Sequence, residues 1–361
     1  MEITVKLHDL LDRERYKELL GSRENEVPAY CLAEYLFAWA KYDGSNVSLL
    51  EVKTNFGTAI MPLLSFDLGD GYRELYSAYG YGGFLGFPEN GTNQELEEAV
   101  RENFSDIRDH LLDKGIIDMF VRSSPFLRNE HFIPEEHLQF DRHTVSVNLD
   151  DWKGKDFPEY FTSKQRWSVR YAIRNGLKTV VYNGLSVNER VLSAFYTLYK
   201  EAMERNNASD YYMLSEELMK GQMEIGEKLE LIVAILQDQI VGAALFLEDR
   251  DRVHYHFSAI DYRKAKYRIT DFILYNAIKK YTLEGKKELH LGRGRSKDLD
   301  EPLYKFKLGY GNQVNSYFIS KVLLDSTSYE RIRREKGIEV SRFFTIHDNL
   351  SFRKGARNAK S

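Results

Sequence analysis

Two segments far apart in the chain share one pattern, and this repetition limits the folds that the chain can adopt. Residues 48–67 (SLLEVKTNFGTAIMPLLSFD) and residues 230–249 (ELIVAILQDQIVGAALFLED) each read as a hydrophobic strand, a short polar turn and a second hydrophobic strand. Helix-like sequence precedes each pair, and a strand-like run followed by a helix comes after it. The pattern favours one α/β unit used twice, although two unrelated β-hairpins can also look alike.

The length of the chain agrees with two domains of ordinary size, since it has 361 residues. Residues 143–149 (HTVSVNL) alternate like a strand, and the following DDWKGKDFP reads as a connection into a new helix. We therefore predict a first domain over 1–145 and a second over 146–312. Residues 313–361 should form a strand at 314–324 and a basic helical tail that is typical of a solvated chain end.

Composition excludes some classes of function. The net charge of −4 argues against DNA binding or RNA binding driven by bulk charge, but it allows a local basic site. The single cysteine, Cys31, excludes an internal disulfide and a multi-cysteine metal site. The chain opens without a signal-peptide pattern, and its apolar runs are too short to cross a bilayer. We therefore expect a cytoplasmic protein with no integral membrane segment.

The segment 291–311 (LGRGRSKDLDEPLYKFKLGYG) carries the first candidate site. A strand should end at Leu291, and a short helix should begin near Asp300, with Pro302 in its first turn and Gly309 just past its end. The loop between them contains two glycines and two arginines: Gly292, Gly294, Arg293 and Arg295. Such a loop can hold an anion or can be solvated, and it matches neither the GxxxxGK[ST] nor the GxGxxG pattern.

The predicted helix has two distinct faces. Leu303 and Phe306 share one face, and Tyr304 and Lys307 share another. This arrangement could bury Phe306 as an apolar anchor and direct Lys307 toward whatever the loop holds.

A second candidate site is the helix expected at 163–176 (SKQRWSVRYAIRNG), which Thr162 or Ser163 can cap and Gly176 can end. Arg166, Arg170 and Arg174 are spaced by four and form one stripe, with Trp167 and Tyr171 beside it. Guanidinium groups bind phosphate oxygens through forked donors. Spacing alone leaves two interpretations open, a phosphate site and a solvated basic face.

Two weaker candidates are an aromatic loop and a histidine pair. The glycine-rich stretch 76–86 (YSAYGYGGFLG) presents Tyr79 and Tyr81, whose hydroxyls could bond a polar ligand or whose rings could simply pack. His254 and His256 lie two apart and should share one face of a strand. No third ligand lies at metal spacing, so we expect core or cleft-wall residues and no metal.

Three of these motifs give the chain a resemblance to the FemABX family of peptidoglycan-bridge aminoacyltransferases, within the GNAT-like acyltransferase superfamily. They are LYKFKLGYG (303–311), SKQRWSVRYAIRNGLKTVV (163–181) and AYGYGGFLG (78–86). The resemblance covers about residues 28–320. It implies two GNAT-like domains, each a mixed, mostly antiparallel sheet flanked by helices, with the last strand returning to the first domain. Residues 186–228 leave no room for a long coiled-coil arm, as in the armless, FemX-like type.

The resemblance also implies an activity and roles for residues. FemABX proteins transfer an aminoacyl group from aminoacyl-tRNA to an amine of a cell-wall precursor, here a nucleotide-sugar-linked one. Lys307 would stabilise the oxyanion, Phe306 would anchor its helix, and Arg205 with Tyr211 or Tyr212 would bind precursor phosphates. The chemistry of their side chains adds further candidates for substrate binding: Arg166, Arg170, Arg293, Arg295, Tyr79 and Tyr81.

The sequence departs from the resemblance at two points. No carboxylate near residues 79–85 matches the base often proposed for the family. The acetyltransferase pyrophosphate loop, Q/RxxGxG/A, is replaced by IDYRKAKYRITDF (260–272), which lacks glycine and with it the backbone cradle for coenzyme A. We therefore expect an aminoacyl-tRNA co-substrate and no resident cofactor. The alternatives are an acetyl-CoA-dependent N-acetyltransferase acting on an amino sugar of surface polysaccharide, and a non-catalytic protein that binds phosphate ligands.

Overall fold

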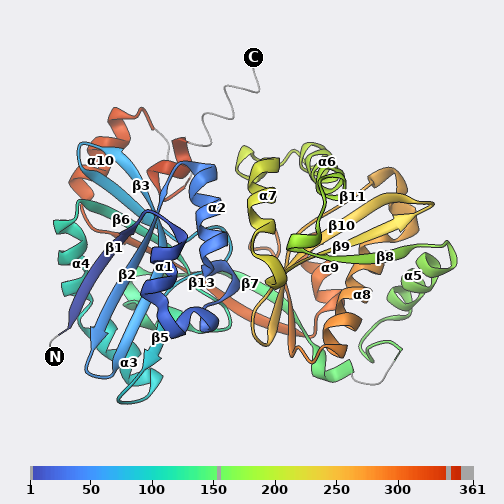
Figure 1. Ribbon diagram of the computed structural model, residues 1–361, viewed down its shortest axis with the longest axis horizontal. Coiled ribbons are helices and arrows are strands. Elements are labelled where there is room, and N and C mark those ends of the chain that lie inside the picture. Colours follow the sequence, from blue (N-terminus) through green and yellow to red (C-terminus); the bar gives the residue numbers. More distant parts are fainter. Residues whose placement is uncertain (1–2, 153–155, 339–342, 351–361) are drawn as a thin grey trace. The chain divides into compact units, whose positions relative to one another are not determined.

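A computed structural model describes residues 3–152, 156–338 and 343–350, so the basic residues expected at 351–361 lie outside the described residues. The chain divides into two compact units, labelled by element in Figure 1. Unit 1 comprises Met1–Asp141, Ser209–Tyr211 and Tyr317–Ser361, and unit 2 comprises Arg142–Ala208 and Tyr212–Ser316. The chain therefore returns to unit 1 twice after leaving it.

Unit 1 is built on a mixed sheet with the strand order β1-β2-β3-β4-β6-β13. Neighbours in this order are antiparallel except β4 and β6, which are parallel, and β5 pairs with β3. Its elements are β1 (Thr4–Leu10), α1 (Arg13–Leu20), α2 (Ala33–Asp43), β2 (Asn46–Thr54), β3 (Gly57–Gly69), β4 (Tyr72–Tyr76), β5 (Leu85–Pro88), α3 (Asn93–Glu102), α4 (Phe104–Asp113), β6 (Ile116–Arg122), β13 (Gln313–Leu323) and α10 (Ser326–Glu335).

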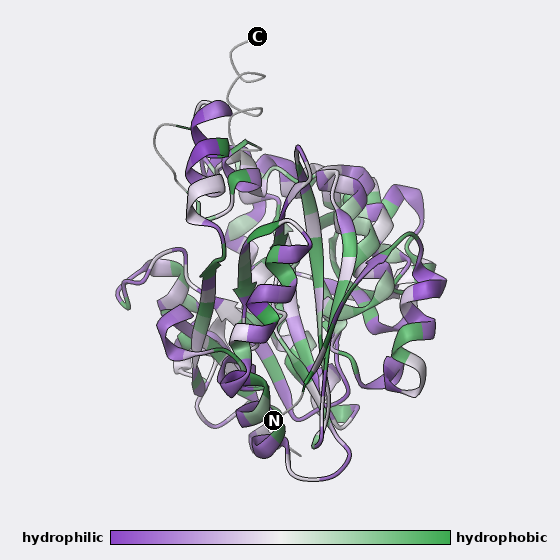
Figure 2. Cartoon of the chain, turned by 90° about the vertical axis from the view of Figure 1, so that its left-hand side faces the viewer, coloured by the Kyte–Doolittle hydropathy of each residue, from purple (hydrophilic) through white to green (hydrophobic). Residues whose placement is uncertain are grey.

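Side chains that alternate along the strands bury both faces of this sheet. Leu50 and Val52 of β2 join a core that α3 and α4 complete. The alternate residues Val47 and Leu49 are buried on the other face, which α2 contacts. Figure 2 shows the result as hydrophobic strands inside a largely hydrophilic outer surface.

Unit 2 repeats the same plan. Its sheet has the order β7-β12-β11-β10-β9-β8, and only β11 and β12 are parallel among the paired strands described here. The run β9-β10-β11-β12 matches β2-β3-β4-β6 in order and direction, so the predicted repetition of one α/β unit is confirmed. The elements are β7 (Leu138–Asn148), α5 (Ser163–Arg174), β8 (Lys178–Asn183), α6 (Glu189–Arg205), α7 (Glu216–Met223), β9 (Leu229–Leu236), β10 (Gln239–Glu248), β11 (Arg252–Ile260), α8 (Ile269–Leu283), β12 (Glu288–Arg293) and α9 (Pro302–Tyr310).

The core of unit 2 lies between its sheet and the helices α5, α8 and α9, while α6 contacts β10 and β11. Two expected boundaries in the 291–311 segment were wrong. Strand β12 continues past Leu291 to Arg293, and α9 includes Gly309 and ends at Tyr310. The helix continues through Gly309 because the backbone N–H of Gly311 still bonds to the Lys307 carbonyl at 2.9 Å.

Candidate active site

Lys307 lies where α9 meets the end of β12. Its Nζ donates a hydrogen bond to the carbonyl oxygen of Arg293 at 2.8 Å. Gly292 has φ of +79°, and a Cβ atom there would lie only 3.4 Å from this Nζ. Burial, and then the nearby Arg293 charge, lower the pKa of Lys307 to about 7. This amine can therefore exchange its proton near neutral pH.

Glu301 holds the loop between β12 and α9 in place. Its carboxylate caps α9 by accepting the backbone N–H groups of Leu303 at 2.9 Å and Tyr304 at 3.0 Å. It also accepts the N–H of Arg295 at 3.0 Å. On the other side, Arg142 of β7 donates to the Arg295 carbonyl at 2.9 Å. The loop is thus fixed by carboxylate and guanidinium contacts to its backbone.

Phe306 packs on the core as part of α9, together with two more deeply buried tyrosines. Tyr304 and Tyr310 are its buried side chains, whereas Leu303 stays half-buried. Phe306 is partly buried against the same core, with its ring 5.3 Å from that of Tyr310. The hydroxyl of Tyr310 bonds to Asp271 at the start of α8. The face that carries Tyr304 and Lys307 is therefore the one that binds the sheet.

Helix α5 is joined to α9 through Gln165. Thr162 and Gln165 form a capping box that starts α5, as the cap predicted at Thr162 or Ser163 requires. The side-chain amide of Gln165 then donates to the carbonyl of Gly309. This contact places the first turn of α5 beside the helix that carries Lys307.

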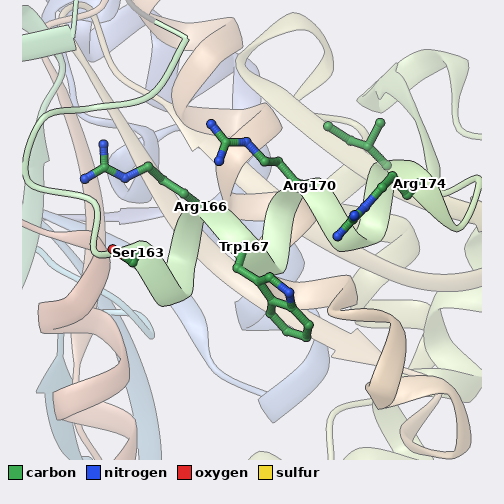
Figure 3. A pocket seen from close by; sticks show the side chains of 6 residues that line it. Ser163, Arg166, Trp167, Arg170 and Arg174 are labelled. Carbon is green, nitrogen blue, oxygen red and sulfur yellow. The ribbon is translucent and has the colours of Figure 1, made fainter.

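The arginine stripe of α5 lines a hollow of about 680 Å³ with Ser163, Trp167 and Ile173. Figure 3 shows Arg166 and Arg170 extending on one side of α5 and the Trp167 ring on another. Within the described residues, Arg166, Arg170 and Arg174 form no ion pair with a carboxylate. Arg170 lies over the Phe157 ring at 5.1 Å. A stripe of like charges without counter-charge is suited to an anionic ligand.

Arg268 extends this basic surface. It precedes α8 with φ of +63°, and its guanidinium lies 5.4 Å from the centre of the Trp167 ring. Trp167 is 44% exposed and stacks on Tyr171 with ring centres 5.0 Å apart. The surface thus offers stacked rings between cations, an arrangement that also suits bases and phosphates of nucleic acid.

In residues 260–272, which lack the glycines of a coenzyme A loop, a side chain already occupies a backbone N–H group. Residues Tyr262–Tyr267 form a short 3-10 helix capped by Asp261. Asp261 accepts both the backbone N–H and the Nε of Arg263, at 3.1 and 2.8 Å. Burial opposes ionisation, but these bonds hold the pKa of Asp261 below its usual value. The Asp261 carboxylate therefore occupies the backbone N–H of Arg263, which a pyrophosphate could otherwise accept.

Two predicted residues of unit 2, Arg205 and Tyr212, contact residues outside the Lys307 loop. Arg205 ends α6 and lies 4.6 Å from the centre of the exposed Tyr262 ring. Arg293 and Arg295 contribute backbone groups to the Lys307 loop, as described above. Tyr212 accepts a bond through its carbonyl from Tyr199 at 2.8 Å.

In unit 1 the aromatic loop packs its rings together. Tyr79 stacks on Trp39 with centres 5.3 Å apart, and Tyr81 lies edge-on to Tyr317 at 5.4 Å. A Cβ atom on Gly80 would overlap the Tyr30 ring, so this glycine serves close packing. Both Tyr79 and Tyr81 remain half-buried.

Tyr211 belongs to this unit and not to that of Tyr212. Its ring lies 6.1 Å from that of Tyr79, and its hydroxyl accepts from Arg122 at 3.1 Å. Arg122 also donates to the carbonyl of Ser77 at 3.1 Å. Arg122 was missed because it ends an ordinary strand. Arg142 and Arg268 were missed for a similar reason, since only tertiary contacts reveal them.

The comparisons with known proteins agree with this architecture. Residues 163–306 match the family model of the acetyltransferase (GNAT) domain. The crystal structure of FemX superposes with a TM-score of 0.63 at 13% identity, over 92% of this chain and 100% of FemX. The fold is that of FemX. No curated protein matches the chain.

Two further structures share the FemX-like fold. The C-terminal domain of a putative lysylphosphatidylglycerol synthetase from Agrobacterium fabrum has a TM-score of 0.56 at 12% identity, over 86% of this chain and 93% of that domain. L-PGS from Bacillus licheniformis has a TM-score of 0.55 at 11% identity, over 89% and 95%. These structures confirm the predicted fold, and the GNAT domain match confirms the prediction of an acyltransferase. In the described part of the chain no helix is long and apolar enough to cross a membrane.

Proposed function

We propose that this protein is an N-acyltransferase that moves an aminoacyl group from aminoacyl-tRNA to an amine of a cell-wall precursor. One observation carries the proposal. A lysine with a pKa of about 7 lies on a helix that Gln165 joins to α5, the helix of the arginine stripe, directly after the stretch 163–306 that matches the GNAT domain model. The first feature suits proton transfer in acyl transfer, and the second suits the phosphates of an RNA donor.

The proposed reaction follows from the chemistry of the amine and the ester. The acceptor amine attacks the ester carbonyl, and neutral Lys307 takes the proton that this amine loses. The resulting ammonium group lies beside the developing oxyanion and stabilises it. As the ester C–O bond breaks, the leaving 3′-oxygen takes the proton from Lys307, which becomes neutral again.

The basic surface of α5 offers a place for the donor. The stripe of Arg166, Arg170 and Arg174 would hold the donor RNA near its acceptor end, with Trp167 as a stacking surface. Such an enzyme would act in the cytoplasm and needs no resident cofactor.

An acetyl-CoA-dependent N-acetyltransferase is the second candidate, because the matched family model describes an acetyltransferase domain. The position of Asp261 argues against it, since a fixed carboxylate would repel the pyrophosphate of coenzyme A. The names of two neighbours in fold add a lipid as a third kind of acceptor to test.

The test is a transfer assay with tRNA charged by a mixture of labelled amino acids. Two acceptors, a UDP-linked peptidoglycan precursor and phosphatidylglycerol vesicles, are compared with a control that lacks an acceptor. A parallel arm replaces charged tRNA by millimolar acetyl-CoA with amino-sugar acceptors. Label in the precursor supports the proposal. Label in the lipid alone contradicts the proposed acceptor, and product from acetyl-CoA alone contradicts the donor.

A further inference from the structure

A chain of three polar side chains runs between neighbouring strands of unit 2. Asp249 follows β10, His254 lies on β11 and His290 lies on β12. The Nε2 atom of His254 is 2.9 Å from Oδ2 of Asp249, and its Nδ1 atom is 3.1 Å from Nδ1 of His290. The parallel register of β11 and β12 sets the two histidines opposite each other. Both rings are buried, at 3% and 1% exposure.

The carboxylate at one end determines where the protons lie. Ionised Asp249 can only accept, so Nε2 of His254 carries a hydrogen. In neutral His254 the Nδ1 atom is then an acceptor, and Nδ1 of His290 must be the donor to it. This assignment makes Nε2 of His290 the basic nitrogen of the pair.

His290, which ends this row of three side chains opposite Asp249, lies close to Lys307. His290 precedes by two residues Gly292, the glycine that faces the Nζ of Lys307. Burial lowers the pKa of His290 well below its usual value, and the charges of His254, Lys307 and Arg252 lower it further. A proton on His290 itself is therefore unfavourable, and a place farther from Lys307 is needed to hold it.

We propose that Asp249, His254 and His290 form a proton relay for Lys307, on the basis of the function proposed above. A proton that leaves Lys307 Nζ, directly or through one water, bonds to Nε2 of His290. The Nδ1 hydrogen of His290 moves to Nδ1 of His254. The positive charge then rests on His254 beside the Asp249 carboxylate, and Lys307 is the neutral amine that the acyl transfer requires.

The cations around His254 are paired with glutamates. Arg252 is already paired with Glu288 at 2.8 Å. Lys286 pairs with Glu248 at 2.8 Å and donates to the Asp249 carbonyl at 3.0 Å. Burial, and then the charge of His254, lower the pKa of His256 well below its usual value.

Each of these cations is balanced by a glutamate, and the low pKa of His256 keeps its ring neutral at pH 7. Within the chain of three, the Asp249 carboxylate is the group that bonds directly to a histidine ring and can balance a proton there. The relay acts through Lys307, so its members are positioning residues and not groups that contact substrate.

Nitrogen NMR of the protein labelled with ¹⁵N-histidine tests the relay without any substrate. Ring signals are assigned from His254→Gln and His290→Gln variants. The expected result at pH 7 is a protonated Nδ1 and unprotonated Nε2 in His290, and on acidification the extra proton appears on His254. A His290 ring protonated at Nε2 at pH 7, or one that takes the extra proton itself, would overturn the relay.

Two variants link the relay to Lys307. Asp249→Asn should release the fixed ring tautomers and lower kcat at least tenfold at pH 7 with KM little changed, and rising pH should restore part of the loss. Asp251→Asn removes the same charge from the same turn, is about half exposed, and should behave like the wild type. Unchanged kcat in Asp249→Asn would refute the relay. Wild-type protein that transfers no aminoacyl group but shows the fixed tautomers would refute the proposed function and leave the relay intact.

Discussion

Lys307 and Arg293 are joined by a hydrogen bond from the ammonium group of one to the carbonyl oxygen of the other, 2.8 Å long. The bond ties α9 to the last residue of β12, so the position of the amine is set by the sheet. It also holds two cationic side chains near each other, which contributes to the low pKa of Lys307. A structural bond thus fixes the position of an amine that can be neutral near pH 7, as the proposed reaction requires.

Replacing Lys307 by alanine should lower kcat by about 10² to 10³-fold, because a group that stabilises developing charge acts mainly in the transition state. KM should change little. Steady-state kinetics of the transfer assay provide the measurement. Lys305→Ala, on the exposed side of the same helix, is the matched control. A kcat within twofold of the wild type would refute the role of Lys307.

Replacing Lys307 by methionine should stabilise the protein, and more so at low pH. The pKa of Lys307 is lower in the folded chain, so between about pH 7 and 10 the unfolded chain binds more protons and stability rises with pH. Methionine removes this cost, and each kcal/mol of relief should raise Tm by about 2 to 4 °C. The gain in Tm over wild type should be larger at pH 6.5 than at pH 9.5. An equal gain at both values would show that the amine is not strongly perturbed.

Removing charge from the α5 stripe should weaken RNA binding in a salt-dependent way. For the double variant Arg166→Gln and Arg170→Gln, the slope of log K against log salt should fall by about 0.7 to 0.9 for each lost phosphate contact. Fluorescence titrations with an acceptor-stem minihelix at several salt concentrations give the slope. Arg190→Gln, an exposed change at the start of α6, should leave it unchanged. Equal slopes in all three proteins would exclude α5 from the RNA site.

In unit 1, Asp118→Asn should raise Tm at pH 7 and less at pH 4. Burial, and then the facing Glu74, raise the pKa of Asp118, so the folded chain binds the extra proton and stability falls as pH rises toward that pKa. Glu74 must keep its carboxylate, since it accepts the backbone N–H of Ile346 and that of His347 at 2.8 Å. Glu74→Gln should therefore cost about 1 to 3 kcal/mol. Thermal unfolding of each variant and the wild type at pH 4 and pH 7 provides the measurement. A lower Tm of Asp118→Asn than of the wild type at pH 7 would contradict the argument.

The local signals in the sequence were sufficient for elements with clear ends. The cap at Thr162 and the glycine at 176, whose φ is +81°, fixed both ends of α5. The two hairpins were found because strand alternation and polar turns are local as well. The prediction for Gly309 was wrong because this glycine, a residue type that often ends a helix, lies inside α9. Its carbonyl accepts a hydrogen bond from Gln165 of the neighbouring helix α5.

Features of the site that depend on strand pairing could not be predicted. His254 and His256 were expected to share one face of a strand, but the pairing of β11 with β10 shifts at His256, and the partner of His254 is His290 on another strand. Nothing local to either histidine indicates that register. The contact of Arg142 with the loop at Arg295 likewise joins residues far apart in the sequence.

Strand β13 has a consequence for how the protein is made. It pairs with β6 from Ile319 to Leu323, so the sheet of unit 1 is completed by residues that the ribosome adds only after the whole of unit 2. Until then the nascent chain exposes the edge of β6, a surface open to pairing with other chains. Unit 2 can fold first although it comes second, and the sheet of unit 1 becomes complete only once β13 has been synthesised.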